Sequence, residues 1–205
     1  MEKSNIHEKI KLLTGSGMWH TQEVEDLPSV HLSDGPHGLR KQEEKERQNN
    51  VSLVSTCYPT ASALACSWDV TAAERLGRAV AKEAWNADVA VLLGPGINMK
   101  RSPLCGRNFE YFSEDPFLAG RLGAAYVSAA QGEDVAVSLK HFAANNQETN
   151  RQTANSQIDE RALREIYLSA FEYVVKTARP ATIMASYNRL NGYYACENRH
   201  LLTEI

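Results

Sequence analysis

The 205-residue chain lacks the features that place a protein in several large classes. Its formal net charge is only −3, so it has no basic excess of the kind that binds nucleic acid. No apolar run approaches the length of a membrane span. The first 13 residues are charged and contain no uninterrupted apolar stretch, so they do not resemble a signal peptide. We therefore expect a cytoplasmic protein, of bacterial type, that binds neither nucleic acid nor membrane.

Cysteine is scarce and follows no pattern. No C-x-x-C pair is present, and the spacing fits neither a disulfide framework nor a zinc site. No two histidines have the spacing of a metal-binding helix. We therefore expect free thiols and no metal site. The four cysteines are Cys57, Cys66, Cys105 and Cys196.

Two common catalytic motifs are also missing. Gly94-Pro95-Gly96 does not complete G-x-G-x-x-G, and no G-K-[ST] occurs, so a phosphate-binding loop is not indicated. No G-x-S-x-G occurs either, so a nucleophilic serine lacks its usual setting. A barrel or doubly wound enzyme that binds a phosphorylated ligand is therefore the weaker alternative.

The sequence does contain short apolar segments that alternate with amphipathic helices. Asp69 is predicted to cap one helix, and Asp115-Pro116 to begin a second. Asp159 is predicted to open a third, single helix, and a shorter helix over 6–13 precedes them all. This alternation predicts an α/β fold with a parallel sheet. Strands are expected at 30–33, 89–93, 135–139 and 181–185, and the third helix is expected to bury Leu163, Ile166, Ala170, Phe171 and Val174.

The length and the end of the chain suggest an incomplete barrel. A full (β/α)8 barrel needs roughly 250 residues, and only about half of its units are visible here. Residues 200–205 have the character of a helix that is just beginning, without a cap or a glycine. We therefore expect one domain over 1–205 that is a partial TIM (β/α)8 barrel truncated at its C-terminus. A small doubly wound domain is the alternative.

Polar residues and glycine follow each predicted strand. They include Ser33-Asp34-Gly35, Arg107, Lys140-His141 and Ser186-Tyr187-Asn188. The carboxyl ends of the strands of a parallel barrel open on one face, where active sites lie. Carboxylates accept hydrogen bonds from sugar hydroxyls, Arg and Lys donate to them, and Tyr offers a flat polar-tipped face. This set of residues therefore favours recognition of hydroxyl groups.

Four motifs occur in order along the chain: Ser33-Asp34-Gly35-Pro36, Gly106-Arg107-Asn108-Phe109-Glu110 with Ser113-Glu114-Asp115-Pro116, Lys140-His141-Phe142-Ala143, and Ser186-Tyr187-Asn188. Together they resemble glycoside hydrolase family 3, in its β-glucosidase branch, and the resemblance implies neither a metal ion nor an organic cofactor. The resemblance covers essentially the whole chain and implies an exo-acting, retaining enzyme for a β-glucoside or related β-glycoside. It also implies that residues 1–205 are an N-terminal barrel domain, and that a C-terminal α/β sandwich domain lies outside them.

The resemblance implies a role for six residues in binding the non-reducing-end sugar. Asp34 would bind hydroxyls on the far edge of the ring, and Arg107, Lys140 and His141 would hold the neighbouring hydroxyls. Tyr187 would lie beside the reacting centre, and Met184 would line the pocket wall. Lys140 and His141 are adjacent, and adjacent strand residues point to opposite faces, so we expect an unusual backbone near His141.

Chemistry alone would suggest Asp34 as the nucleophile, with Glu110 or Glu148 as the acid. A retaining glycosidase needs two carboxyl groups about 5–5.5 Å apart, and no pair here can be shown to meet that. In the family the nucleophile is the Asp of a later Ser-Asp-Trp motif, and the acid is a Glu of the second domain. We therefore expect both carboxylates beyond Ile205 and very little or no turnover by this chain alone. Glu110 is expected to form a salt bridge or brace a loop, and Glu148 to lie at the surface or support the residues that bind the ligand.

Several alternatives stay open at this stage. The chain could be a catalytically inactive sugar-binding fragment or a misfolding one, since half a barrel exposes unpaired sheet edges. It could also belong to a β-xylosidase-type member of the family. The sugar is not fixed by the sequence, and xylose, galactose and arabinose compete with glucose.

Overall fold

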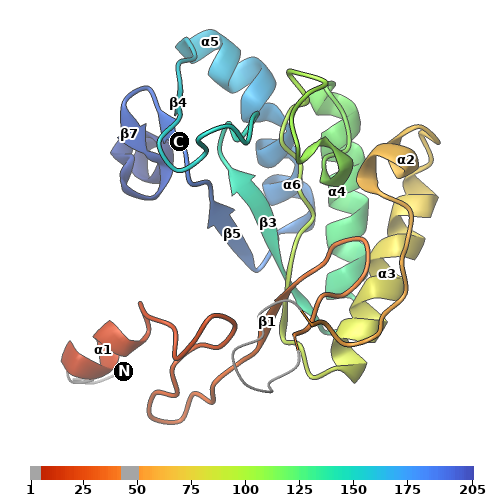
Figure 1. Cartoon of the computed structure of the whole chain (residues 1–205), viewed down its shortest axis with the longest axis vertical. Coiled ribbons are helices and arrows are strands. Elements are labelled where there is room, and N and C mark those ends of the chain that lie inside the picture. The colour runs from red at the N-terminus through yellow and green to blue at the C-terminus, as the bar shows by residue number, and fades with distance from the viewer. Residues whose placement is uncertain (1–5, 43–50) are drawn as a thin grey trace.

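A parallel four-stranded sheet forms the centre of the fold, in the order β1-β2-β3-β5 (Figure 1). The structure is a computed structural model and describes residues 6–42 and 51–205. The strands of this sheet lie side by side in the order in which they occur along the chain. At least one helix connects each strand to the next, as in the first half of a (β/α)8 barrel. This confirms the predicted α/β class. The strands are β1 (Leu32–Asp34), β2 (Val91–Leu93), β3 (Ala136–Phe142) and β5 (Thr182–Ala185).

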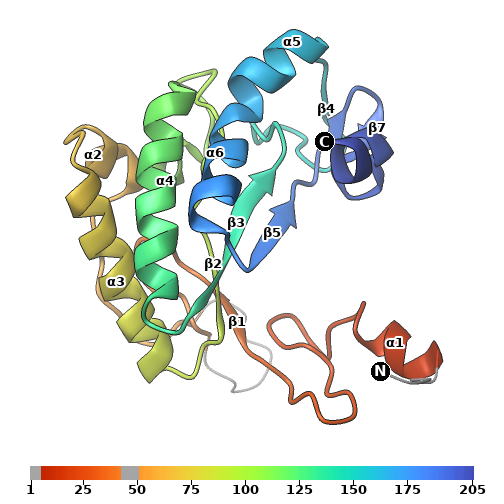
Figure 2. The same cartoon turned by 180° about the vertical axis from the view of Figure 1, so that it is seen from behind.

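Three helices lie side by side on one face of this sheet (Figures 1 and 2). They are α3 (Val70–Asn86), α4 (Pro116–Gln131) and α6 (Ser169–Ala178), and the short helix α2 (Ala61–Ala65) precedes them. The predicted caps are confirmed, because Asp69 accepts a hydrogen bond from the Thr71 amide and Asp115 accepts from the Phe117 amide. Their buried stripes form one core with the strands, which includes Leu76, Val80, Leu92, Leu122, Leu139 and Phe171.

The third predicted helix is interrupted, so the expectation of a single helix was wrong. Asp159 does cap its start, but α5 (Glu160–Ala162) passes into a π-helical turn over Leu163–Tyr167 before α6 begins. A π-turn adds a residue to the helical repeat and rotates the next helical turns about the axis. Ile166 is therefore 38% exposed, contrary to prediction, whereas the other expected core residues Leu163, Ala170, Phe171 and Val174 are buried.

A small second sheet lies beside the end of β5 and was not predicted. It joins β4 (Asn155–Ser156), β6 (Arg189–Leu190) and β7 (Tyr193–Tyr194), with β6 and β7 antiparallel. Strands of two residues carry no periodic signal, so the sequence could not indicate them. Two short helices follow, a 3₁₀ turn over Ala195–Glu197 and a π-helical turn over His200–Glu204, where a helix was expected to begin.

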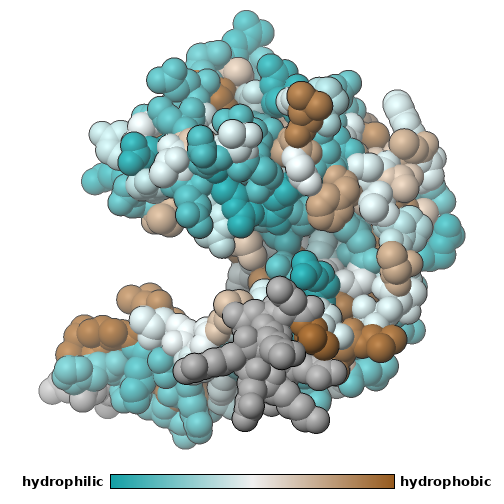
Figure 3. All heavy atoms as spheres, viewed as in Figure 1, coloured by the Kyte–Doolittle hydropathy of each residue, from teal (hydrophilic) through white to brown (hydrophobic). Residues whose placement is uncertain are grey.

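The N-terminal segment extends away from the sheet as an arm. It contains α1 (Ile6–Lys11) and isolated bridges such as Gly15 with Thr21, and it enters the sheet at β1. Figures 1 and 2 show α1 apart from the helical layer, and Figure 3 shows a deep hollow between the arm and the body. In the part of the chain that the structure describes, no helix has the length and apolarity needed to cross a membrane. All four cysteines are free thiols.

Candidate functional site

The predicted site residues come from the carboxyl ends of the four parallel strands. Asp34 ends β1, and Lys140 and His141 lie near the end of β3. Arg107 precedes the 3₁₀ turn η1 (Asn108–Glu110), in the long connection that follows β2. Tyr187 lies two residues beyond β5. The fold thus brings to one edge residues that are far apart in the sequence.

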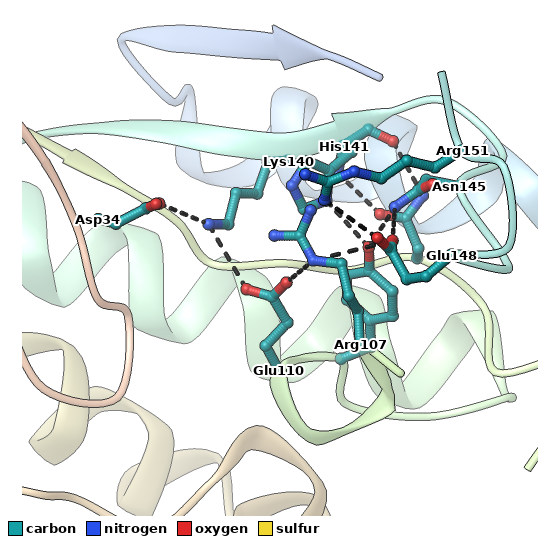
Figure 4. A network of polar contacts seen from close by, with 10 residues as sticks. Asp34, Arg107, Glu110, Lys140, His141, Asn145, Glu148 and Arg151 are labelled. Atoms are coloured by element: carbon teal, nitrogen blue, oxygen red, sulfur yellow. Dashed lines mark hydrogen bonds and ion pairs between the residues drawn. The ribbon is translucent and has the colours of Figure 1, made fainter. Parts of the chain in front are cut away.

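Acidic and basic side chains alternate along the floor of this site (Figure 4). Lys140 Nζ lies 3.1 Å from Asp34 Oδ1 and 3.5 Å from Glu110 Oε2. The other oxygen of Glu110 accepts from Arg107 Nε. Arg107 Nε also lies 4.0 Å from Glu148 Oε1, and Arg151 Nη1 lies 3.0 Å from Glu148 Oε2. Six charges of alternating sign therefore run from Asp34 to Arg151.

Burial divides these charges into inner and outer members. The side chain of Lys140 is 2% exposed and that of Glu110 is 6% exposed, whereas that of Asp34 is 39% exposed. A buried charge is tolerated only when it is paired and hydrogen-bonded. Glu110 is thus the internal counterion of two cations, in agreement with the salt bridge expected for it. Asp34 keeps part of its carboxylate exposed to solvent.

Tyr187 and Met184 border the same site from β5 and the loop beyond it. Tyr187 is exposed, and the guanidinium carbon of Arg151 lies 5.1 Å from the centre of its ring, within range of a cation–π interaction. Met184 is half-buried and pairs in register with Lys140 on the neighbouring strand. Glu148 is half-buried and contacts Arg151 and Asn145, which agrees with the supporting role, rather than the surface role, of the two expected for it.

The backbone of β3 is irregular where Lys140 and His141 lie, as expected. The Lys140–His141 and Phe142–Ala143 peptide bonds are both cis, and the pairing of β3 with β5 shifts register between Lys140 and Phe142. Asn98 holds this segment from the other side. Its side chain accepts from the His141 amide at 2.8 Å and donates to the His141 carbonyl at 2.9 Å.

Two histidines of the site are held in the neutral state. Burial, together with the cations Arg107, Lys140 and Arg151, lowers the pKa of His141 to about 2. Burial also lowers the pKa of His37 to about 4, although Glu110 partly opposes it. Both rings are therefore uncharged at neutral pH, and the positive charge of the site comes from Lys and Arg.

These low pKa values predict a loss of stability in mild acid. Below pH 6.5 the unfolded chain protonates its histidines and the folded chain does not, so the free energy of unfolding falls as the pH falls. Between pH 7 and pH 5 each of these two histidines should cost about 2 kcal/mol of unfolding free energy. Urea unfolding of His37→Gln should therefore depend less steeply on pH than that of the wild type. His7→Gln, on the exposed face of α1, is the control, and an unchanged slope for His37→Gln would contradict the prediction.

Sequence reasoning missed several residues of this network. Tyr111 and Asn145 are buried and are linked by a hydrogen bond of 2.9 Å, and Asn98 braces His141 as described. A signal was available for two of them. Tyr111 directly follows the Gly106–Glu110 motif, and Asn145 belongs to the polar run after β3. Asn98 ends the polar run after β2, but its role depends on its contact with the backbone of β3, which the local sequence does not indicate.

Known proteins resemble this chain in both sequence and fold. Thermostable beta-glucosidase B of Acetivibrio thermocellus is 52% identical over all of this chain and 28% of that protein. Exo-alpha-(1->6)-L-arabinopyranosidase of Bifidobacterium longum is 49% identical over 98% of this chain and 27% of that protein. The structure of beta-glucosidase from Kluyveromyces marxianus in complex with glucose superimposes with a TM-score of 0.93 at 43% identity, over 99% of this chain and 24% of that one.

The chain therefore spans little more than a quarter of the length of the curated relatives that it matches. The family model described as the glycosyl hydrolase family 3 N-terminal domain matches residues 32–205, which include every residue of the site. The chain belongs to glycosyl hydrolase family 3.

Proposed function

We propose that this chain forms the sugar-binding part of an exo-acting, retaining β-glucosidase-type glycosidase. The observation that carries the proposal is the convergence of Asp34, Arg107, Lys140 and His141 on one edge of a parallel sheet, with Tyr187 beside them. Such an edge offers one partly free carboxylate and several donors, which is the complement of a ring of hydroxyl groups. Met184 would contribute an apolar wall. Bond cleavage would proceed by double displacement, without metal or cofactor.

Both catalytic carboxylates are proposed to lie outside residues 1–205. Glu110 and Glu148 are engaged with Arg107, Lys140 and Arg151, which suits counterions better than groups that exchange protons with a substrate. Asp34 is paired with Lys140 and belongs to a binding motif. The nucleophile would come from a later strand of the barrel and the acid from a domain beyond the barrel.

Glucose is the sugar we propose first, because relatives named β-glucosidase recur among the matches. An L-arabinopyranoside is the second candidate, since the relative from Bifidobacterium longum is named for that substrate. The two pyranoses differ at the ring edge that Asp34 is proposed to bind, because arabinopyranose lacks the hydroxymethyl group. Comparing aryl glycosides of both sugars tests the assignment directly.

A chimera tests the proposed activity. This chain would replace the matching N-terminal stretch of the Acetivibrio thermocellus enzyme, so that the remainder supplies the missing carboxylates. We expect the chimera to hydrolyse 4-nitrophenyl β-D-glucoside, and the isolated 205-residue chain to release no nitrophenolate. Turnover by the isolated chain would overturn the location proposed for the carboxylates. A folded chimera without activity would overturn the proposed enzyme.

Asp34→Asn in the chimera tests the binding site itself. The substitution keeps the size of the side chain but weakens its hydrogen bonds to hydroxyl groups, and bonds to charged groups contribute about 1.5–3 kcal/mol. We expect kcat/KM to fall roughly 10- to 100-fold. The control is Asp69→Asn at the cap of α3, whose side chain contacts Thr71 and Arg75 rather than the site residues, and which should leave kcat/KM unchanged.

A further inference from the structure

A chain of hydrogen bonds approaches His141 from the side of the loop after β3. Tyr111 Oη lies 3.0 Å from His141 Nδ1. The side-chain amide of Asn145 lies 2.9 Å from Tyr111 Oη and 3.0 Å from Glu148 Oε1, in both cases through Nδ2. Figure 4 shows Glu148, Asn145 and His141 together in this part of the site. The direction in which each bond donates decides what His141 can offer to a ligand.

The direction is set at the outer end of the chain. Glu148 is ion-paired with Arg151 at 3.0 Å, so its oxygens act only as acceptors. The Asn145 atom that faces Glu148 must therefore be the NH₂ group, which has two hydrogens. One hydrogen goes to Glu148 and the other goes to Tyr111 Oη. Tyr111 is thus an acceptor toward Asn145.

The hydroxyl hydrogen of Tyr111 then has a single possible acceptor among the described residues. Tyr111 is fully buried, and among residues 6–42 and 51–205 its hydroxyl has only Asn145 and His141 as hydrogen-bond partners. Burial raises the pKa of Tyr111 well above its usual range, so the phenol keeps its hydrogen. If His141 Nδ1 also donated, a buried O–H would lack an acceptor, at a cost of about 1–3 kcal/mol. Tyr111 therefore donates to His141 Nδ1.

The tautomer of His141 is determined by this bond. Burial and the nearby cations keep the ring neutral, and a neutral imidazole that accepts at one nitrogen carries its hydrogen on the other. We propose that Tyr111 is a positioning residue that fixes His141 as the Nε2–H tautomer, so that the ring presents a donor to its ligand.

Nε2 of His141 is available to donate to a ligand. It has no hydrogen-bond partner within the described part of the chain, and it is not one of the fully enclosed atoms. A ligand oxygen could therefore reach it. We assign this oxygen to a sugar hydroxyl, which would accept the hydrogen bond from Nε2, and this assignment rests on the proposed function. The tautomer itself does not.

Nitrogen-15 NMR tests the assignment on the 205-residue chain without any sugar. Long-range ¹H–¹⁵N spectra separate the protonated from the unprotonated ring nitrogen, and the signals of His141 are identified by their absence from His141→Gln. At pH 7 we expect His141 to show an unprotonated Nδ1 and a protonated Nε2. A protonated Nδ1, or a doubly protonated ring, would overturn the proposal without the need for any variant.

Tyr111→Phe then tests the part that Tyr111 plays. We expect the share of the Nδ1–H form to rise from nearly none to a readily detected fraction, because the donor to Nδ1 is lost. Tyr126→Phe is the matched control, since it removes a buried hydroxyl that donates to the Pro36 carbonyl at 3.0 Å and does not contact His141. If the tautomer of His141 is unchanged in folded Tyr111→Phe, Tyr111 does not determine that tautomer, and its proposed role is overturned. The result is independent of whether the chimera hydrolyses a glycoside.

Discussion

Glu110→Gln is expected to cost about 3 kcal/mol of unfolding free energy, the lower end of the range for breaking a buried ion pair. Glutamine preserves the size of the side chain but removes the charge that faces both Lys140 and Arg107. Lys140 would keep only Asp34 as a counterion, and the side chain of Asp34 is 39% exposed and screened by solvent. Urea unfolding at pH 7, followed by tryptophan fluorescence, measures the loss.

Two further variants separate the buried pair from charge in general. Glu133→Gln removes a carboxylate that pairs with Arg78 at 3.2 Å and Lys82 at 3.9 Å on the surface, so its cost should stay below about 1 kcal/mol. In Glu110→Gln combined with Lys140→Met, both buried charges are absent, and the loss should be smaller than the sum of the two single losses. Additive losses would show that Glu110 and Lys140 do not stabilise each other.

The parts of the fold that the sequence predicted correctly are those with local causes. A helix begins where Asp69 or Asp115 can accept from its first free amides, and both positions can be recognised from a few neighbouring residues. Buried parallel strands form short apolar runs, and all four were found within a few residues. The π-turn at Leu163–Tyr167 escaped notice because its sequence has ordinary helical spacing.

The candidate site shows a different limit of prediction from sequence. Each strand end could be recognised by its own polar motif, but the pairing of Lys140 with Asp34 joins residues 106 positions apart. Only the order of strands in the sheet brings them together. The resemblance to a family predicted the binding residues, whereas Glu110, Tyr111 and Asn145 contact those residues and had no role assigned by it. The supporting network is thus what the structure adds.

The position of that network depends on how closely helices α3 and α4, behind the sheet, approach each other. Gly77 lies in α3 where it faces α4, and a Cβ placed there would lie 2.4 Å from the Tyr126 carbonyl oxygen and 3.1 Å from the Tyr126 Cα. These are backbone atoms, so neither can move without its helix. Tyr126 in turn donates to the Pro36 carbonyl, in the loop that follows Asp34. The contact of α3 with α4 therefore supports one side of the site.

Gly77→Val is accordingly expected to cost about 3 kcal/mol, at the upper end of what overpacking a core usually costs. Gly77→Ala tests the contact with the smallest possible side chain. Without the contact, alanine would stabilise a helix interior by about 1 kcal/mol relative to glycine. We expect Gly77→Ala to destabilise nonetheless, since its Cβ already meets the Tyr126 carbonyl. Gly17→Ala, where an added Cβ has no neighbour within 4 Å, is the control for replacing a glycine. A gain in unfolding free energy for Gly77→Ala in urea would show that the two helices separate without cost.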